Sequence, residues 1–276
     1  MAVIIRSDII KRWLDNQDAF ASIKAITGNV VRSKEGRTTK RVEIEGAGFY
    51  TKLHEGVGWF EVFKNLLQLR LPIVGASNEW LAINRLHELG LDTMTAVAYG
   101  KKGFNPAAQK SFIITEELTD TLSLARLVEQ WAEQPPTLAF KRSLIHKVAD
   151  ISRVLHGDGI NHRDLYICHF LLDTSTGLDQ HPEAAPRLFL VDLHRAQMRE
   201  QVPHRWLVKD IASLYFSSLD IGISQKDIFR FLKSYYQLPL REILINKHAF
   251  LRAVEKRATS LYVRDFGRQP TLPCKA

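Results

Sequence analysis

The stretch "GINHRDLYICHFLLD", residues 159–173, gathers side chains that could do chemistry. His162, Arg163 and Asp164 come first, and a mostly apolar run follows that is interrupted by His169. The stretch could be a metal site, a polar segment of a packed core, or a catalytic loop. A structural zinc site is the least favoured, because zinc ligands usually come in pairs such as C-x-x-C or H-x-x-x-H and no such pair occurs here.

The motifs around this stretch favour a catalytic loop. A long predicted helix precedes H-R-D at residues 162–164, an aliphatic strand follows, and a second apolar strand ends at Asp192 in "VDLH". This is the layout of the catalytic loop and metal-binding aspartate of kinases. Asp164 would orient the acceptor hydroxyl, and Asp192 would hold Mg²⁺, which prefers oxygen ligands. Either aspartate could instead be a turn or cap residue.

Two residues upstream extend the pattern. Lys52 lies on a predicted strand whose alternation resembles V-A-I-K, where the lysine supplies a positive charge for the phosphates of a nucleotide. Glu79, in the first turn of the next predicted helix, would be its ion-pair partner, and Glu88 is the competing partner. Alternatively, Lys52 is a solvated lysine of an edge strand, and Glu79 is favoured only by the helix dipole.

Two features depart from the kinase pattern. No G-x-G-x-x-G occurs between the first strands, so the phosphates would be covered differently. His169 stands where H-R-D-x-x-x-x-N ends in asparagine, and imidazole is a softer ligand than an amide oxygen. His169 could bind a second metal weakly, orient Asp164, or be a hydrogen-bonded buried histidine.

The elements expected to position these residues differ along the chain. Residues 23–53 alternate with the period of β-strands, and a helix follows with Ser77 or Asn78 as N-cap and Gly90 just past its end. The segments "TMTAVAYG" and "KSFIITEEL" are further predicted strands. The first part of the chain is therefore predicted to be a mainly antiparallel sheet with one principal helix.

Helices dominate from Thr121 onward. One predicted helix ends at Gly157–Gly159, and three more are predicted around residues 204–218, 224–236 and 246–263. The apolar residues of the first of these recur with helical spacing: Leu144, Val148, Ile151 and Leu155.

Composition and charge limit the classes of protein to which the chain can belong. Apolar residues make up 45% and charged residues 25% of the 276 residues, as in soluble globular proteins, and no apolar run is long enough for a membrane span. The N-terminus has charges within any apolar stretch, which argues against a signal peptide, and two distant cysteines indicate a reducing, cytoplasmic compartment. The net charge of +8 favours acidic partners.

From about Phe20 to about Arg257, these motifs closely resemble the lipopolysaccharide core heptose(I) kinases of Gram-negative bacteria (WaaP/RfaP type). The resemblance is carried by "GINHRDLYICHFLLD", "VDLHRAQ", "SFIITEEL", "LYFSSLDIGIS" and the segment from Lys64 to Gly100. Histidine in place of the asparagine is characteristic of that family. Cysteine is expected before Tyr166, where this chain has Leu165, a position without a catalytic role.

The resemblance implies an α+β, two-lobed protein-kinase-like fold. Residues 1–117 would form an N-terminal lobe, mainly an antiparallel sheet, which covers the nucleotide. Residues 118–276 would form a mainly helical C-terminal lobe with the catalytic loop and the metal-binding aspartate. The implied reaction is ATP- and Mg²⁺-dependent phosphorylation of the first heptose of the inner core, at the cytoplasmic face of the inner membrane.

The same resemblance assigns roles to individual residues. Lys52 and Glu79 would serve the nucleotide, Asp164 and His169 the catalysis, and Asp192 with His169 the metal. Structural support would come from His162 and from Asp210, which would brace the catalytic loop. Backbone groups of the strand end and hinge would hold the adenine: Glu116, Glu117 and Leu118.

The implied partner is a lipid-linked, anionic sugar acceptor, with no nucleic acid. The basic residues expected to attract it are Lys64, Arg70, Arg163 and Arg195. The apolar face of the segment 54–75 could pack on the sheet, rest on the membrane, or take an acyl chain. Its members are Trp59, Phe60, Phe63 and Leu67. An acyl carrier protein is a further partner suggested for this family.

Two other functions would use the same motifs. A protein kinase would share the catalytic loop, but no A-P-E follows Asp192 and the segment after it is short and basic. A kinase-like binding scaffold without activity would account for the missing glycine loop and for His169.

Overall fold

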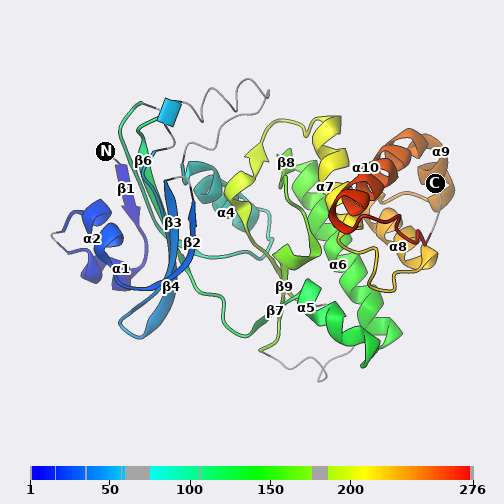
Figure 1. Cartoon of the computed structure of the whole chain (residues 1–276), viewed down its shortest axis with the longest axis horizontal. Coiled ribbons are helices and arrows are strands. Elements are labelled where there is room, and N and C mark those ends of the chain that lie inside the picture. Colours follow the sequence, from blue (N-terminus) through cyan, green and yellow to red (C-terminus); the bar gives the residue numbers. More distant parts are fainter. Residues whose placement is uncertain are drawn as a thin grey trace. The chain divides into compact units, whose positions relative to one another are not determined.

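The computed structural model describes residues 2–15, 17–34, 36–56, 58–59, 75–105, 107–175 and 186–273. The chain divides into two compact units (Figure 1). Unit 1 consists of Met1–His87, Met94–Thr119 and Leu193–Arg195; unit 2 consists of Glu88–Thr93, Asp120–Asp192 and Ala196–Ala276. None of the described helices is long and apolar enough to cross a membrane.

Unit 1 is built on a six-stranded sheet in which all neighbouring strands are antiparallel. Its order is β1 (Ala2–Ile5), β5 (Ala96–Lys102), β6 (Lys110–Glu116), β4 (Ala47–His54), β3 (Arg37–Ile44) and β2 (Asn29–Lys34). Glu45 and Gly46 both have positive φ at the β3–β4 turn, as a two-residue hairpin loop of the I′ type requires. The sheet predicted from alternation is present.

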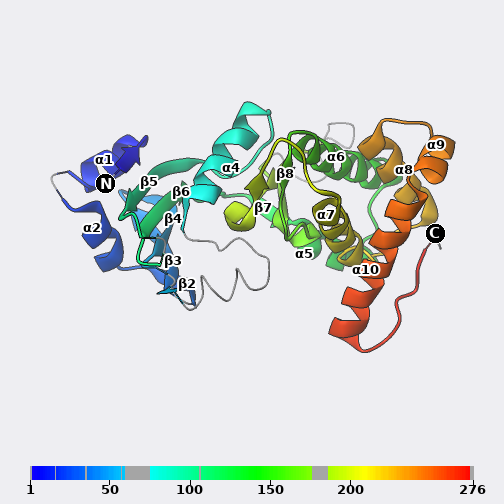
Figure 2. The same ribbon diagram turned by 90° about the horizontal axis from the view of Figure 1, so that it is seen from above.

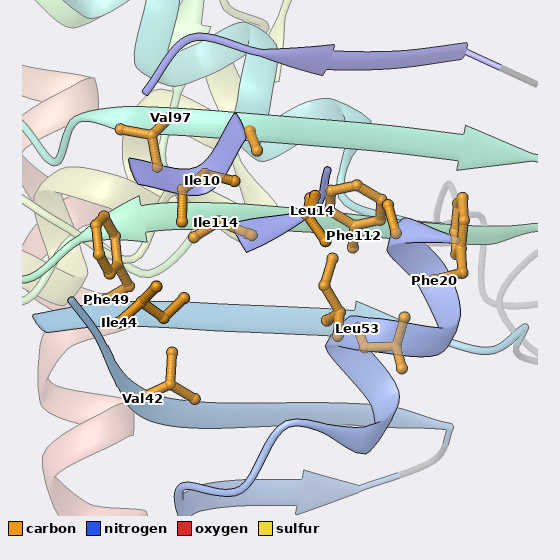
Figure 3. Close-up of a cluster of buried hydrophobic side chains, with 13 residues drawn as sticks. Ile10, Leu14, Phe20, Val42, Ile44, Phe49, Leu53, Val97, Phe112 and Ile114 are labelled. Atoms are coloured by element: carbon orange, nitrogen blue, oxygen red, sulfur yellow. The ribbon is translucent and has the colours of Figure 1, made fainter. Parts of the chain in front are cut away.

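Two short helices cover one face of this sheet, α1 (Asp8–Trp13) and α2 (Ala19–Ala25). Figure 3 shows their side chains against those of the strands, with Phe20 edge-on to Phe112 at a centroid distance of 5.0 Å. Strand β1 and helices α1 and α2 were not predicted from the sequence. Six or seven residues are too few for helical periodicity to stand out, and these helices depend on burial of their apolar face.

Helix α4 (Ser77–Glu88) is the principal helix of unit 1, as predicted. It begins at Ser77 itself, so the prediction that Ser77 or Asn78 is the N-cap was wrong. The Ser77 hydroxyl instead shares a 2.7 Å hydrogen bond with the Tyr99 hydroxyl. Trp80 stacks on the Tyr99 ring at 5.3 Å, which fixes the helix against β5.

Unit 2 is mainly helical. Its helices are α5 (Leu124–Glu129), α6 (Leu138–Gly157), α7 (His204–Phe216), α8 (Gln225–Tyr236), α9 (Leu240–Asn246) and α10 (His248–Phe266), with a 3₁₀ turn at Gln130–Ala132. In both views α6 lies beside α8, and α7 beside α10 (Figures 1 and 2). The four predicted apolar positions of α6 are all buried, because the stripe with helical spacing faces the other helices.

Short strands of unit 2 flank the H-R-D stretch. β8 (Ile160–Asn161) pairs with β11 (Gln197–Met198), and β9 (Phe170–Asp173) pairs with β7 (Thr121–Ser123) and β10 (Leu188–Leu190). A 3₁₀ turn, Ile167–His169, leads into β9. The predicted α+β class is therefore confirmed: antiparallel sheet in the N-terminal part and helices in the C-terminal part.

Candidate active site

The H-R-D loop of unit 2 is held by a buried carboxylate on α7. Asp210 is fully buried, and its two oxygens accept hydrogen bonds from the backbone amides of His162 (2.7 Å) and Arg163 (2.8 Å). The Nε2 atom of His156 lies 3.4 Å from Asp210 as well. The loop that carries Asp164 is therefore fixed at its backbone, which is the bracing contact predicted for Asp210.

The side chain of His162 connects this loop to the strand end before Asp192. Burial lowers the pKa of His162, so the ring is neutral near pH 7. Its Nε2 atom lies 2.9 Å from the carbonyl oxygen of Val191, so this nitrogen carries the proton and donates it. The predicted supporting role of His162 thus has a physical basis, since one ring spans both segments.

His169 faces both predicted functional aspartates. Its Nδ1 atom lies 2.7 Å from the carbonyl oxygen of Asp164, and its Nε2 atom lies 3.6 Å from the carboxylate of Asp192. The ring also stacks on that of His162 at 5.6 Å. The structure therefore brings together three of the predicted site residues within unit 2: Asp164, His169 and Asp192.

The protonation of His169 depends on its neighbours. Burial opposes the charged imidazolium. Cys168 next to it, the carbonyl of Asp164 and the carboxylate of Asp192 outweigh that effect and raise the imidazole pKa to about 9. The ring can donate from Nδ1 in either form, and loss of the Nε2 proton exposes a lone pair toward Asp192.

Asp192 and His169 fit a divalent cation. The Asp192 side chain is 31% exposed and supplies the hard carboxylate oxygens that Mg²⁺ prefers. The facing imidazole nitrogen offers a second ligand once it has lost its proton. Asp192 has a φ of 63° and Arg163 a φ of 74°. Left-handed backbone at residues other than glycine is uncommon and gathers at functional sites, where surrounding contacts enforce it.

Lys209 was not among the residues predicted from the sequence. Its ammonium group donates to the carbonyl oxygen of Arg163 and lies 3.5 Å from an Asp164 carboxylate oxygen. Lys209 therefore contacts both the backbone of the loop and the Asp164 carboxylate. The one available signal was its position next to Asp210 on the same helix, because a residue beside a loop brace is near the loop.

The ion pair predicted in unit 1 is present. The Lys52 ammonium on β4 donates to the Glu79 carboxylate on α4, and the two side chains are 11% and 1% exposed. Lys52 pairs with Glu79, as predicted over Glu88. A buried carboxylate of this kind holds the lysine in one rotamer.

His54, two residues after Lys52, was also missed. Burial is the main cause that lowers its pKa to about 4, and the charge of Arg37 adds to the effect. Its Nε2 atom is buried with no hydrogen-bond partner among the described residues. His54 is therefore a neutral, buried ring beside the lysine.

The segment predicted to hold adenine follows β6. The amide of Glu116 donates to the Thr95 carbonyl, and the amide of Glu117 to the Gly48 carbonyl. The Glu117 carboxylate accepts two hydrogen bonds from the guanidinium of Arg41, at 2.6 and 2.7 Å. Among the described residues, the backbone of Leu118 has no backbone partner, so Leu118 is the member of the predicted set whose amide is available.

The residues predicted to bind the acceptor or to form the apolar face of the segment 54–75 are described only in part. Arg195 ends the 3₁₀ turn Leu193–Arg195 of unit 1 and is partly buried. Trp59 is 50% exposed. The other predicted acceptor and apolar residues lie outside the described residues: Phe60, Phe63, Lys64, Leu67 and Arg70.

Unit 2 also contains an apolar cavity of about 460 Å³. It is lined from helices α5 to α10 by side chains that include Leu144, Ile211, Leu232 and Leu251. Its polar lining includes Lys141, which pairs with Asp227 at 2.9 Å. A cavity with this lining suits an aliphatic ligand.

Comparison with known proteins gives consistent matches over most of the chain. The family model described as the lipopolysaccharide kinase (Kdo/WaaP) family matches residues 21–235. The lipopolysaccharide core heptose(I) kinase WaaP of Pseudomonas aeruginosa is 48% identical over 263 residues, 95% of this chain and 96% of that protein. WaaP of Escherichia coli K12 is 47% identical over 249 residues, 90% and 92% of the two chains. The solved structure of WaaP in complex with acyl carrier protein has 43% identity and a TM-score of 0.83, covering 95% of this chain and all of that one.

Proposed function

Because this chain belongs to the lipopolysaccharide kinase (Kdo/WaaP) family, we propose that it phosphorylates the first heptose of the lipopolysaccharide inner core with ATP. The observation that supports this most is the constellation in unit 2: Asp164 on a braced loop, with His169 in contact with that loop and facing Asp192. These are the residue types that phosphoryl transfer requires, one carboxylate for the hydroxyl and another for the metal.

The chemical step is an in-line displacement. The heptose hydroxyl oxygen forms a bond to the γ-phosphorus of ATP, the bond from that phosphorus to the β,γ-bridging oxygen breaks, and ADP leaves. Asp164 accepts the hydroxyl proton and aligns the attacking oxygen. Lys209 holds the Asp164 carboxylate in position, because its ammonium lies 3.5 Å away.

The other residues act on the nucleotide. Lys52 contributes a fixed positive charge to the phosphates, and Glu79 holds its rotamer. Asp192 and His169 would hold Mg²⁺, which would neutralise charge on the phosphate oxygens. The backbone of Leu118 binds the adenine. Residues 1–117 thus serve the nucleotide, and residues 118–276 carry the catalytic loop.

Two measurements test this function. Wild-type ATP turnover should depend on a heptose-containing core acceptor, and Asp164→Asn should lower it by about 10²–10⁴, the usual range for a general base. Asp192→Asn should also lower turnover and, unlike Asp164→Asn, weaken binding of ATP with Mg²⁺. Turnover without the acceptor, or transfer to a peptide, would indicate a protein kinase, and binding without turnover an inactive scaffold. Near-normal turnover of Asp164→Asn would show that the loop assignment is wrong.

An acyl carrier protein is the proposed protein partner. A related solved structure is described as WaaP in complex with acyl carrier protein, and the apolar cavity of unit 2 suits an aliphatic chain delivered by such a carrier. Since the acceptor is lipid-linked, we also place the enzyme at the cytoplasmic face of the inner membrane, in peripheral contact with it. The basic excess of the chain favours that anionic surface.

A further inference from the structure

A cluster of cations surrounds one tryptophan next to the H-R-D loop in unit 2. Three cationic groups lie over the Trp206 ring: Arg163 at 5.0 Å, Arg205 at 5.2 Å and Lys209 at 5.7 Å from its centroid. Arg199 lies at the same loop, because its guanidinium donates to Oδ1 of Asn161, the residue directly before His162. The cluster is adjacent to the catalytic residue, because Lys209 lies 3.5 Å from Asp164.

Two of these arginines have no acidic partner among the described residues. The Arg199 guanidinium donates to two neutral oxygens, Oδ1 of Asn161 at 2.6 Å and Oε1 of Gln197 at 2.5 Å. Arg205 is exposed, and its guanidinium lies over the Trp206 ring. Burial, and then the positive charge of Arg205, lower the pKa of Arg199, as expected for like charges without a counter-ion.

The local backbone adds to the positive potential. Arg205 is the second residue of α7, whose first turn has no acidic residue and whose N-cap, Pro203, makes no side-chain hydrogen bond. The N-terminal end of a helix favours anions, so a cation there is unfavourable unless an anion joins it. The Nε1 atom of Trp206 is buried and likewise finds no acceptor among the described residues. The cluster therefore has surplus donors and surplus positive charge.

We propose that Arg199 and Arg205 form a binding site for an anionic group, carboxylate or phosphate, on the acceptor sugar. The site rests on the proposed sugar-kinase function and adds a specificity element to it. Arginine suits this task because its planar guanidinium can bind both oxygens of such a group. With the anion held beside Asp164, a neighbouring hydroxyl of the same acceptor is presented to that carboxylate.

Steady-state kinetics of Arg205→Gln test the site. We expect the KM for the core acceptor to rise about tenfold to a hundredfold, the range for a lost charge-assisted hydrogen bond. The kcat and the KM for ATP should change little, because a contact made equally in the ground and transition states affects binding alone. Higher salt should raise the wild-type KM more steeply than that of the variant.

Arg241→Gln is the matched control. Arg241 is an exposed arginine at the second residue of α9, also after an N-cap proline, and it lies in the same unit. Its replacement should leave the acceptor KM unchanged. Arg199→Lys, which retains the charge, should bind the acceptor better than Arg199→Gln, and thermal unfolding of both separates binding from the structural contact with Asn161.

Chemically altered acceptors distinguish the two anions. If the group is a carboxylate, reduction of the acceptor carboxyl groups to alcohols should raise the wild-type KM to the value of Arg205→Gln and leave the variant unaffected. If the group is a phosphate, removal of the phosphate groups from the acceptor should raise the wild-type KM in the same way and leave the KM of Arg205→Gln unaffected. Equal acceptor KM values for Arg205→Gln, Arg241→Gln and wild type would overturn the proposal. A wild-type enzyme without acceptor-dependent turnover would instead overturn the proposed function.

Discussion

At the residue scale, the two ring nitrogens of His169 do different things. Nδ1 contacts the backbone of Asp164, and Nε2 faces the carboxylate of Asp192. An asparagine at this position could offer an oxygen to a metal, but its side chain is shorter. The sequence left orientation of Asp164 and metal binding open as roles for His169, and the position of the ring is compatible with both.

Replacement of His169 separates these functions. We expect His169→Asn to retain activity within about tenfold of wild type at saturating Mg²⁺, because an amide oxygen is a hard ligand. His169→Ala should lose about 10²-fold or more, since neither a ligand nor a hydrogen-bond donor remains. The measurement is turnover of both variants against Mg²⁺ concentration. Equal, mild losses for the two variants would show that His169 only fills space.

His54 predicts a pH-dependent stability. The pKa of His54 in the folded protein is about 4, below the ordinary value near 6.5. Between pH 6.5 and 4, His54 therefore binds a proton in the unfolded chain but not in the folded chain. The free energy of unfolding should therefore fall by about 3 kcal/mol as the pH drops from 6.5 to 4. Urea unfolding of wild type and His54→Gln at several pH values measures it.

The control for this prediction is His87→Gln. His87 is an exposed histidine of the same unit, so its removal should leave the slope of stability against pH as in wild type. His54→Gln should flatten the slope. An unchanged slope in His54→Gln would mean that another group causes the pH dependence.

A functional residue could be predicted from the sequence where the chemistry itself requires that residue type at that place in the chain. Lys52, Asp164 and Asp192 stand out because phosphoryl transfer needs those residue types in that order. The roles of Lys209 and His54 depend on tertiary contacts, and the position of Lys209 next to Asp210 is the one signal that the sequence held for either residue. Short elements such as α1 were missed for the same reason.

At the element scale, α7 organises the site of unit 2. Asp210 holds the backbone of the loop, Lys209 reaches Asp164, and Arg205 and Trp206 form the cation cluster. One helix can do this because residues three and four apart share a face. The opposite side is anchored by burial of Ile211 and Ala212, among other apolar residues, against α10.

The strand β8 leads directly into this loop, and Gly159 before it leaves no room for a side chain. Gly159 has a φ of 75°, and a Cβ there would lie 1.8 Å from the backbone oxygen of Arg199. We expect Gly159→Ala to lower the free energy of unfolding by about 2 kcal/mol or more and to reduce turnover. Thermal unfolding and acceptor-dependent turnover check both effects.

Gly157 provides the control two residues earlier. It ends α6, and a Cβ there would meet no atom within 4 Å. Gly157→Ala should therefore be neutral or stabilise the protein by about 0.5–1 kcal/mol, as alanine favours helix. Similar destabilisation by both substitutions would mean that the close approach of residue 159 to the Arg199 backbone is not the cause.

At the scale of the whole molecule, charge and cavity indicate two different partners. The net charge of +8 suits an anionic, lipid-linked acceptor, whereas the cavity of unit 2 is lined mainly by apolar side chains. An acceptor held by its charges does not need a buried aliphatic cavity. Under the proposed partnership with an acyl carrier protein, the cavity would hold the acyl chain.

A ligand that binds only the folded state raises the melting temperature, so the acyl-chain assignment is measurable. An acyl carrier protein loaded with a long acyl chain should raise the Tm of the wild-type enzyme. The same carrier protein without an acyl chain should raise this Tm much less. Leu232→Trp, which puts a larger side chain on the cavity wall, should reduce the increase. Leu238→Trp is the control, because Leu238 is 38% exposed and is not part of the lining. Equal Tm increases with acylated and unacylated carrier would show that the chain does not enter the cavity, whatever the carrier contacts on the surface.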